Sequence, residues 1–465
     1  MPTKSANLGE ALDGWLDATT HGLGDVPAGL VDDAAAASAD FMLCALISRL
    51  LPAEDGRERD QGMEAAGPAV WWTGAVHRAE VAAEANLLAG IAADFDAVHY
   101  LAGGHLSAFL APALLGRRDL PLDAALRLQA IATEFAVRVG QVIKDRARLK
   151  GLHVTPLVGG LSSVYALALA NGYSPDRVKW CLRLFLSTFR SDYGLLGSDG
   201  RLYQMAQAMR QAHAAVAEGG VHTRLDLAAA REWWRPLTTL GIPIDSPNES
   251  NESNAAHDLP AGLPDGWISG DRFTDLKPMP CCAYFFSVLA VVAGLRGCVA
   301  TDSVRRLEVH VPRYAFVAHR GAGDGSWLAP FDLAHNVAIC WLLGRDSWTP
   351  LPELTRDEVR AMRELVHLRV TSDDLPVTAV AVTGDGTGAE VTLAAGDLPP
   401  VDGAARRHAA LRQKCDVVRR RLGPAWHAPR ADQGAGELLR ELLDRSGQDV
   451  RGLATGLPTL NGAFQ

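Results

Sequence analysis

The sequence predicts a two-domain protein, in which a large all-α helical bundle precedes a smaller α+β domain. From about residue 30 to residue 240, apolar residues recur at the three- and four-residue spacing of amphipathic helices. After about residue 272 they alternate with polar residues, as in half-buried strands. A polar segment at 244–271 separates the two patterns. The 465 residues are enough for two hydrophobic cores.

Three features define the helical part. The clearest helix is expected over 122–142, where one face carries Leu122, Ala125, Leu128, Ile131, Ala132, Phe135, Val139 and Val142. A second helix should begin at Pro175, with the hydroxyl of Ser174 as its cap. Gly159 and Gly160 precede an alanine-rich segment and should allow close contact between helices.

Strands are expected after residue 272, at 307–311, 366–370, 377–382 and 391–393. The glycine-rich segment 384–388 predicts a hairpin between the last two strands. Between the first two, Thr355 and Glu358 form a capping box for a helix over 359–365. The apolar run 281–295 predicts a buried helix, and helical spacing returns from about residue 400.

Composition narrows the class of protein. The net charge is −9 and the chain has no basic run, which argues against nucleic acid as a partner. Seven scattered cysteines without a CxxC pair do not predict a zinc or iron–sulfur cage, and they suit a reducing, cytoplasmic location. The first residues lack the apolar region of a secretory signal, and the run 281–295 is too short to span a bilayer. We therefore expect a cytoplasmic protein that does not bind membranes.

Side chains able to transfer protons concentrate between Asp94 and His105. Asp94, Asp96, His99 and His105 lie within twelve residues, around a glycine pair and ahead of an apolar, helix-like run. Carboxylates and imidazoles near a helix start suit proton transfer at a small acidic substrate. The plain alternative is a capped turn with solvated charges. The two histidines lack the i, i+4 spacing of a helical ligand pair, so no metal is expected.

Five stretches, in order, resemble the motifs of the MmgE/PrpD family, which includes 2-methylcitrate dehydratase and cis-aconitate decarboxylase. They are 94–96 with His105 (DFDD…HP in the family), 151–155 (GxHxT), 197–204 (KPLHxG), 277–282 (KPYPCC) and 331–335 (FSxxY). The resemblance runs from about residue 30 to the end of the chain. It implies a discontinuous helical domain, 1–271 completed by 403–465, and an α+β lid domain at 272–402. It also implies a homodimer and catalysis without a cofactor.

The resemblance implies two groups of site residues. The expected catalytic residues are His105, His153, Asp94, Asp96, Cys282 and His335. The expected substrate-binding residues are Lys277, Arg201, His99, Gln204 and Tyr203. Lys277 would anchor an anionic group or stabilise developing negative charge, and the histidines would transfer protons.

The chain departs from the family motifs at several positions, with Val98 for threonine, Arg201 for lysine, Gln204 for histidine, Phe286 for histidine, Asp332 for serine and His335 for tyrosine. Arginine can bind a carboxylate with two hydrogen bonds but does not lose a proton at accessible pH. Plain alternatives are a salt bridge for Arg201, a core histidine for His153 and a small buried residue for Cys282.

The motifs predict a lyase that acts on a small carboxylic acid or related carbonyl compound by a dehydratase-like elimination. Decarboxylation, isomerisation or cyclisation would use the same carbanion-like intermediate. A relative that binds a ligand without turning it over is the alternative from another class. The altered motif positions favour a specialised biosynthetic acid over 2-methylcitrate or cis-aconitate.

Overall fold

The structure is a computed structural model of the chain that describes residues 13–14, 16–17, 26–50, 78–115, 117, 119–221, 226–242, 267, 274–321, 329–344, 356–372, 376–384, 388–393, 403–422 and 433–445. These residues are mostly helical and include a four-stranded sheet. Apart from Trp267, the polar segment at 244–271 lies outside the described residues, as does Thr355 of the expected capping box.

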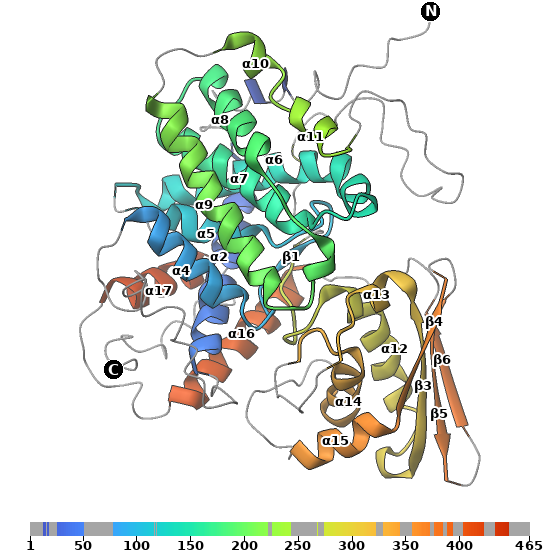
Figure 1. Cartoon of the computed structure of the whole chain (residues 1–465). Helices are drawn as coiled ribbons and strands as arrows, with labels where there is room; N and C mark the ends of the chain where they lie inside the picture. The colour runs from blue at the N-terminus through green and yellow to red at the C-terminus, as the bar shows by residue number, and fades with distance from the viewer. Residues whose placement is uncertain are drawn as a thin grey trace, which may run out of the picture.

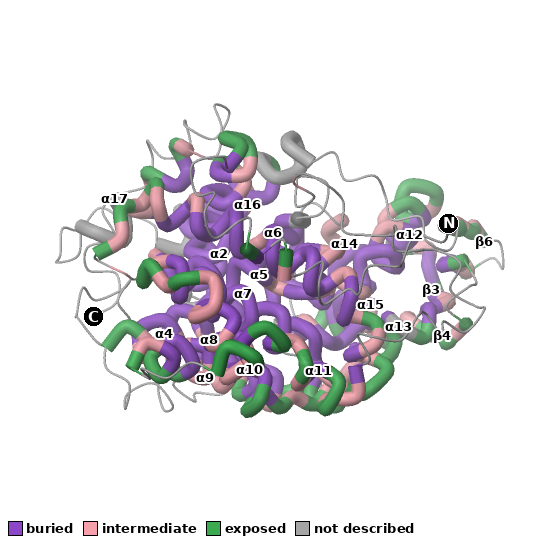
Figure 2. Tube along the Cα trace, turned by 90° about the horizontal axis from the view of Figure 1, so that it is seen from above, coloured by how far each residue is buried: buried purple, intermediate pink, exposed green. Residues whose placement is uncertain are grey.

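The helical region is built around one buried helix (Figures 1 and 2). Its helices are α2 (Ala28–Leu50), α4 (Ala79–Ile91), α5 (Leu106–Leu115), α6 (Leu122–Leu149), α7 (Val154–Ala170), α8 (Pro175–Thr188), α9 (Gly200–Val221), α10 (Leu227–Arg231) and α11 (Arg235–Thr239). α5, α6, α8 and α9 pack around α7, which is buried from its first residue to Leu169. This enclosure explains why α7 is apolar on all sides.

Two of the helix predictions can be checked in detail. A Cβ atom on Gly159 would overlap the ring of Phe109, and one on Gly160 would overlap the ring of Phe185. The glycine pair therefore allows α5 and α8 to approach α7, as predicted. α8 does begin at Pro175, but the hydroxyl of Ser174 makes no capping hydrogen bond.

All four predicted strands are present: β3 (Val304–Pro312), β4 (Val366–Thr371), β5 (Val377–Thr383) and β6 (Gly388–Leu393). Their order in the sheet is β4-β3-β5-β6. β3 and β4 are parallel, whereas β5 pairs antiparallel with β3 and β6, which confirms the hairpin. The predicted buried helix is the short η5 (Ala283–Phe285) followed by α12 (Phe286–Arg296), and α12 packs on β5 and β6.

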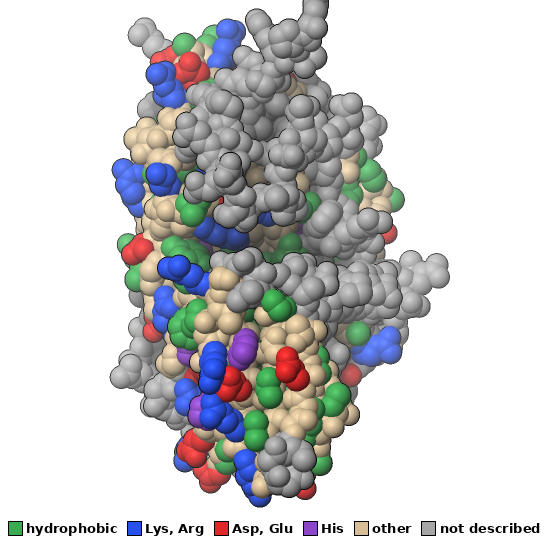
Figure 3. Space-filling model, turned by 90° about the vertical axis from the view of Figure 1, so that its right-hand side faces the viewer, with side chains coloured by type: hydrophobic (Ala, Val, Ile, Leu, Met, Phe, Trp, Pro, Cys, Tyr) green, Lys and Arg blue, Asp and Glu red, His purple; other side chains and the backbone are tan. Residues whose placement is uncertain are grey.

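Two further helices, α14 (Leu333–Leu343) and α15 (Arg356–Glu364), pack against each other and against β4. The short helix α13 (Arg313–Val317) follows β3. On the outer side of the sheet, Glu308 forms ion pairs with Arg306, His310 and Arg369. Figure 3 shows this side of the molecule, where acidic, basic and histidine side chains intermingle. The mixture of signs is typical of a solvated face.

Two features of the chain path matter for the site. The C-terminal helices α16 (Gly403–Leu422) and α17 (Gln433–Arg445) pack against α2, so the chain returns to the helical region after the sheet (Figure 1). In addition, β1 (Val98–His99) pairs antiparallel with β2 (Thr274–Asp275). The second feature brings residue 277 beside the 94–105 segment. Among the described residues, no helix is long and apolar enough to cross a membrane.

Candidate active site

The segment after α4 folds into a tight loop that returns His105 to the side of Asp96. Asp94 has a φ of 50°, a left-handed conformation that residues other than glycine rarely adopt. The backbone of His99 bonds Gly104 in both directions, and Gly103 between them has a φ of 72°. The glycine pair in the sequence is thus the turn that sets the site geometry.

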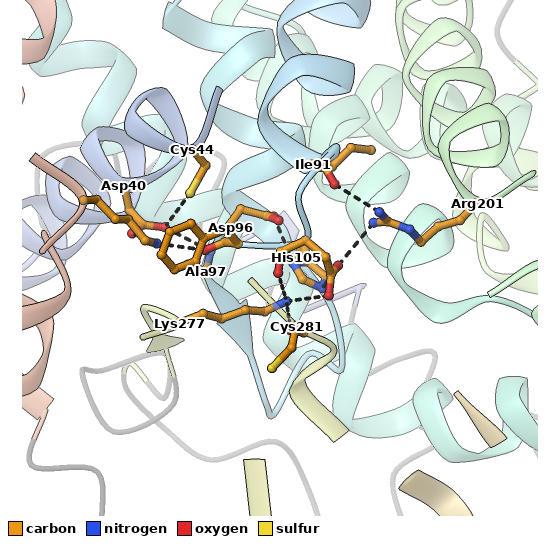
Figure 4. Close-up of polar contacts among 12 residues, drawn as sticks. Asp40, Cys44, Ile91, Asp96, Ala97, His105, Arg201, Lys277 and Cys281 are labelled. Atoms are coloured by element: carbon orange, nitrogen blue, oxygen red, sulfur yellow. Dashed lines mark hydrogen bonds and ion pairs between the residues drawn. The ribbon is translucent and has the colours of Figure 1, made fainter. Parts of the chain in front are cut away.

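Asp94 is held by two cationic side chains (Figure 4). The ammonium group of Lys277 donates to the Asp94 carboxylate at 2.9 Å, to the Asp94 carbonyl oxygen at 2.8 Å and to the Cys281 carbonyl oxygen at 3.1 Å. Arg201 donates to the other carboxylate oxygen at 3.2 Å. Burial favours a higher pKa for Asp94, but Lys277, Arg201 and His105 outweigh it and hold the pKa below its usual value. Asp94 is therefore a buried, ionised carboxylate.

Asp96 and His105 form a second pair. Nδ1 of His105 lies 2.9 Å from Oδ2 of Asp96, which is fully buried. A carboxylate in this position accepts the Nδ1–H proton and leaves Nε2 of the imidazole free to gain or lose a proton. That Nε2 lies 3.9 Å from Oδ1 of Asp94. The arrangement is an oriented imidazole beside two carboxylates.

His153 lies at the N-terminus of α7 and contacts Gln204 of α9. The side-chain amide of Gln204 donates to the Asp192 carbonyl oxygen, so its oxygen, 3.2 Å from His153, accepts the Nδ1–H proton. Burial, with the nearby charge of Arg201, lowers the pKa of His153 to about 3. His153 is therefore an uncharged imidazole whose Nε2 can accept a hydrogen bond.

Five of the predicted site residues line one cavity that opens to solvent: Asp94, His105, His153, Arg201 and Cys282. They come from segments as far apart in the sequence as residues 94 and 282. Burial raises the pKa of Cys282 to about 12, and the charge of Asp94 adds to this effect. Its sulfur is therefore a thiol rather than a thiolate.

Three predicted residues lie behind this wall and hold residues on it. Asp96 holds His105, Gln204 holds His153, and Lys277, which is fully buried, holds Asp94. Lys277 and Gln204 were predicted to contact substrate, and in the structure both contact protein groups instead. The three N–H donors of Lys277 already have acceptors, and both polar atoms of the Gln204 amide are bonded to protein.

Three other predicted residues do not line the cavity: His99, Tyr203 and His335. His99 is buried in β1, and its Nδ1 accepts a hydrogen bond from the Ala102 amide. Tyr203 is 65% exposed, because adjacent residues on a helix face different directions and Gln204 takes the inward one. His335 is buried in the first turn of α14, where its backbone N–H is capped by Asp332. The structure therefore places these three away from the cavity wall, and their predicted roles stay predictions.

The cavity wall also contains residues that the motif comparison missed: Tyr100, Arg148, Tyr193, Met205 and Tyr284. Arg148 is in the last turn of α6, three residues before the GxHxT-like stretch at 151–155, and Tyr284 follows Cys282 by two residues. The position of Arg148 and Tyr284 close to two of the motifs is the sequence signal that could have identified them.

The carboxylate oxygens of Asp94 and Asp96 and a ring nitrogen of His105 lie within 4.8 Å of one another, a spacing that could suit a metal ion. However, both carboxylate oxygens of Asp94 already accept hydrogen bonds from Lys277 and Arg201. These two positive charges oppose binding of a further cation. The donor set therefore fits an ion-pair network better than a divalent metal.

No protein-family model matches the chain, and no curated protein matches it significantly. The resemblance to the MmgE/PrpD family thus rests on the five motifs alone.

Proposed function

We propose that the chain is a cofactor-independent lyase of the MmgE/PrpD type, which eliminates water or a similar group from a small carboxylic acid or carbonyl compound. The observation that carries the proposal is the pairing of His105 with Asp96 on the wall of a cavity that also holds the ionised Asp94. An imidazole oriented by a carboxylate is a suitable general base.

In the proposed reaction, Nε2 of His105 removes a proton from the carbon next to the carboxyl or carbonyl group. The C–H electron pair moves onto the oxygen of that group, which gives an enolate-like intermediate that can take a proton back from solvent-exchanged His105. When the intermediate collapses, the carbon–carbon double bond forms and the bond to the β-oxygen breaks. The imidazolium then returns the proton to the departing oxygen, and water leaves. Asp96, at 2.9 Å, and Asp94, at 3.9 Å, stabilise the transient positive charge on His105.

The other wall residues support this chemistry. The guanidinium group of Arg201 supplies positive charge near the ionised Asp94 and stacks on Phe331, with 5.0 Å from its carbon to the ring centre. Neutral His153 can accept a hydrogen bond from a substrate hydroxyl through Nε2. The thiol of Cys282 is a weak neutral donor rather than a nucleophile.

The proposal includes the division into domains 1–271 with 403–465 and 272–402, a cytoplasmic location and a homodimer. The resemblance implies the discontinuous first domain and the dimer. The packing of α16 and α17 on α2 supports the return of the chain to the helical region. Light scattering during size-exclusion chromatography tests the dimer, which predicts a mass twice that of the chain.

The test of function is product analysis with a panel of di- and tricarboxylic acids and hydroxyacyl compounds. Loss of water supports the elimination, whereas loss of CO2 or an unchanged mass would point to decarboxylation or isomerisation. Replacement His105→Ala should lower turnover by about 10²- to 10⁴-fold. The control is His310→Ala on the outer sheet face. Ligand binding without any product would indicate a non-catalytic relative.

A further inference from the structure

Among the described charged residues that line the cavity, Arg148 is distinguished by its weak ion pairing. The carboxylates of Asp94 and Asp96 are offset by the fully charged side chains of Lys277 and Arg201. Arg148 also lines the cavity but has only one ion-pair partner in the described residues, Asp145 at 3.3 Å. The side chain of Asp145 is 67% exposed, so water screens this pair. Arg148 thus provides one largely uncompensated positive charge on the wall.

The ring of Tyr284 lies against the guanidinium group of Arg148. The central carbon of that group lies 5.4 Å from the ring centre of Tyr284, and the Tyr284 hydroxyl is hydrogen bonded to that of Tyr193. Burial raises the pKa of both phenols, so both keep their protons. Tyr284 donates this hydrogen bond and Tyr193 accepts it, so the O–H of Tyr193 can donate to a ligand. A terminal nitrogen of Arg148 also lies near Gly103, where a side chain would crowd it.

Much of the remaining wall is apolar. The residues that supply this surface are Val98, Val154, Leu196, Met205, Ala283 and Phe331. Such a wall favours burial of hydrocarbon and penalises an unpaired second charge. The cavity is therefore suited to one acidic group attached to an apolar body.

We propose that Arg148, together with the Tyr193–Tyr284 hydroxyl pair, binds the single carboxylate of a substrate whose remainder is apolar. The inference rests on the proposed function, because it takes the bound acid to be the substrate. It also predicts a preference for monocarboxylic acids over di- and tricarboxylic acids. Guanidinium–carboxylate pairs are often bidentate, which would fix the orientation of the acid.

The experiment measures binding by titration calorimetry with the full chain, without turnover. The probes are hexanoate, its neutral amide hexanamide, and the dicarboxylate adipate. The wild-type protein should bind hexanoate at least about tenfold more tightly than either comparison compound, since a hydrogen bond to a charged group contributes about 1.5–3 kcal/mol. Replacement Arg148→Met should weaken hexanoate binding by roughly 10- to 100-fold and leave hexanamide binding unchanged.

Arg127→Met is the matched control, because Arg127 lies on the same helix and pairs with an exposed aspartate away from the cavity. Tyr193→Phe is the second variant if Arg148→Met does not fold, and it should weaken hexanoate binding by about three- to tenfold. Equal or tighter binding of adipate, no binding of hexanoate, or unchanged affinity in the variants that fold would overturn the inference. Tight hexanoate binding through Arg148, with no product either from the panel or from 3-hydroxy monocarboxylic acids such as 3-hydroxyhexanoate, would uphold the carboxylate site and remove the proposed function.

Discussion

Two buried carboxylates hold the same loop from opposite sides, and their surroundings differ. Asp94 and Asp40 each pair with a fully buried lysine, Lys277 and Lys414 respectively. Lys414 of α16 also donates to the carbonyl oxygen of Phe95 at 2.8 Å, and Asp40 accepts the amide of Ala97 at 3.1 Å (Figure 4). Together the two pairs fix Asp94, Phe95 and Ala97, the residues on either side of Asp96.

The difference lies in the number of cations and in access to the cavity. Asp94 has Arg201 as a second cation and lines the cavity, and its pKa is lowered. For Asp40, burial outweighs Lys414, and the nearby Asp96 adds repulsion, so the pKa of Asp40 is raised. One buried carboxylate is thus kept ionised beside the proposed chemistry. The other clamps α2 and α16 to the loop.

The largest expected effect is on stability. Replacement Lys414→Met should lower the free energy of unfolding by about 3–5 kcal/mol, because it leaves Asp40 buried without its cation. Urea denaturation measures the loss. Replacing Asp40 and Lys414 together by apolar residues should recover much of the lost stability. A loss below about 1 kcal/mol in the single variant would contradict a structural role for the Asp40–Lys414 pair.

The next largest effect should be on turnover, and it should distinguish the Asp96–His105 pair from the Asp40–Lys414 pair. Asp96→Asn removes the charge that orients and stabilises His105, and turnover should fall by about 100-fold, or about 2.7 kcal/mol in the barrier. Asp40→Asn should change turnover by less than about threefold, once corrected for folded protein. Equal losses in both variants would remove the distinction between a catalytic and a structural centre.

The pH dependence of stability should have opposite signs for the two carboxylates. The ordinary pKa of an aspartate is 3.8, and that of Asp94 in the folded protein is lower. Ionised Asp94 therefore stabilises the fold fully above pH 3.8, and this stabilisation is lost as the pH falls through the pKa of the folded state. For Asp40 the folded value is higher, so stability falls as the pH rises from 3.8 through that value. Urea denaturation across this range measures both effects. Asp94→Asn should abolish the loss of stability that occurs as the pH falls below 3.8, and Asp40→Asn should abolish the loss that occurs as the pH rises above 3.8. The reverse assignment would refute the account.

The smallest expected effects are on the reactivity of two cysteines, Cys282 near Asp94 and Cys44 near Asp40. Burial raises the pKa of Cys282 to about 12 and that of Cys44 well above its usual value. Both should react with iodoacetamide at least about tenfold more slowly than the exposed Cys298. Mass spectrometry of the native protein measures the rates. Cys282→Ala should change turnover by less than about threefold; a larger loss would give its thiol a direct catalytic role.

Much of the fold could be predicted because it follows from local periodicity. The strands at 307–311 and 377–382 and the helix from Leu122 have patterns that depend on neighbours in sequence. The missing capping bond of Ser174 shows the limit of such rules, since a suitable residue at the N-cap need not use its hydroxyl.

The site was predictable only in part, because side-chain direction depends on tertiary contacts. His105 and His153 line the cavity, whereas Lys277 binds Asp94 from behind its wall. The Asp40–Lys414 pair joins residues 374 positions apart and has no local signal. Arg148 lies close to a motif in the sequence, but its place on the cavity wall beside the ring of Tyr284 depends on tertiary contacts.

The most direct test of the central claim is hydrogen exchange at the carbon next to the carboxyl group of a bound acid. Hydroxy acids that bind the protein are incubated with it in D2O and followed by NMR. Wild-type protein should exchange this hydrogen for deuterium, and His105→Gln should slow the exchange by about 10²-fold or more, while His310→Ala should not. Equal exchange rates in wild type and His105→Gln would contradict the assignment of His105 as the base.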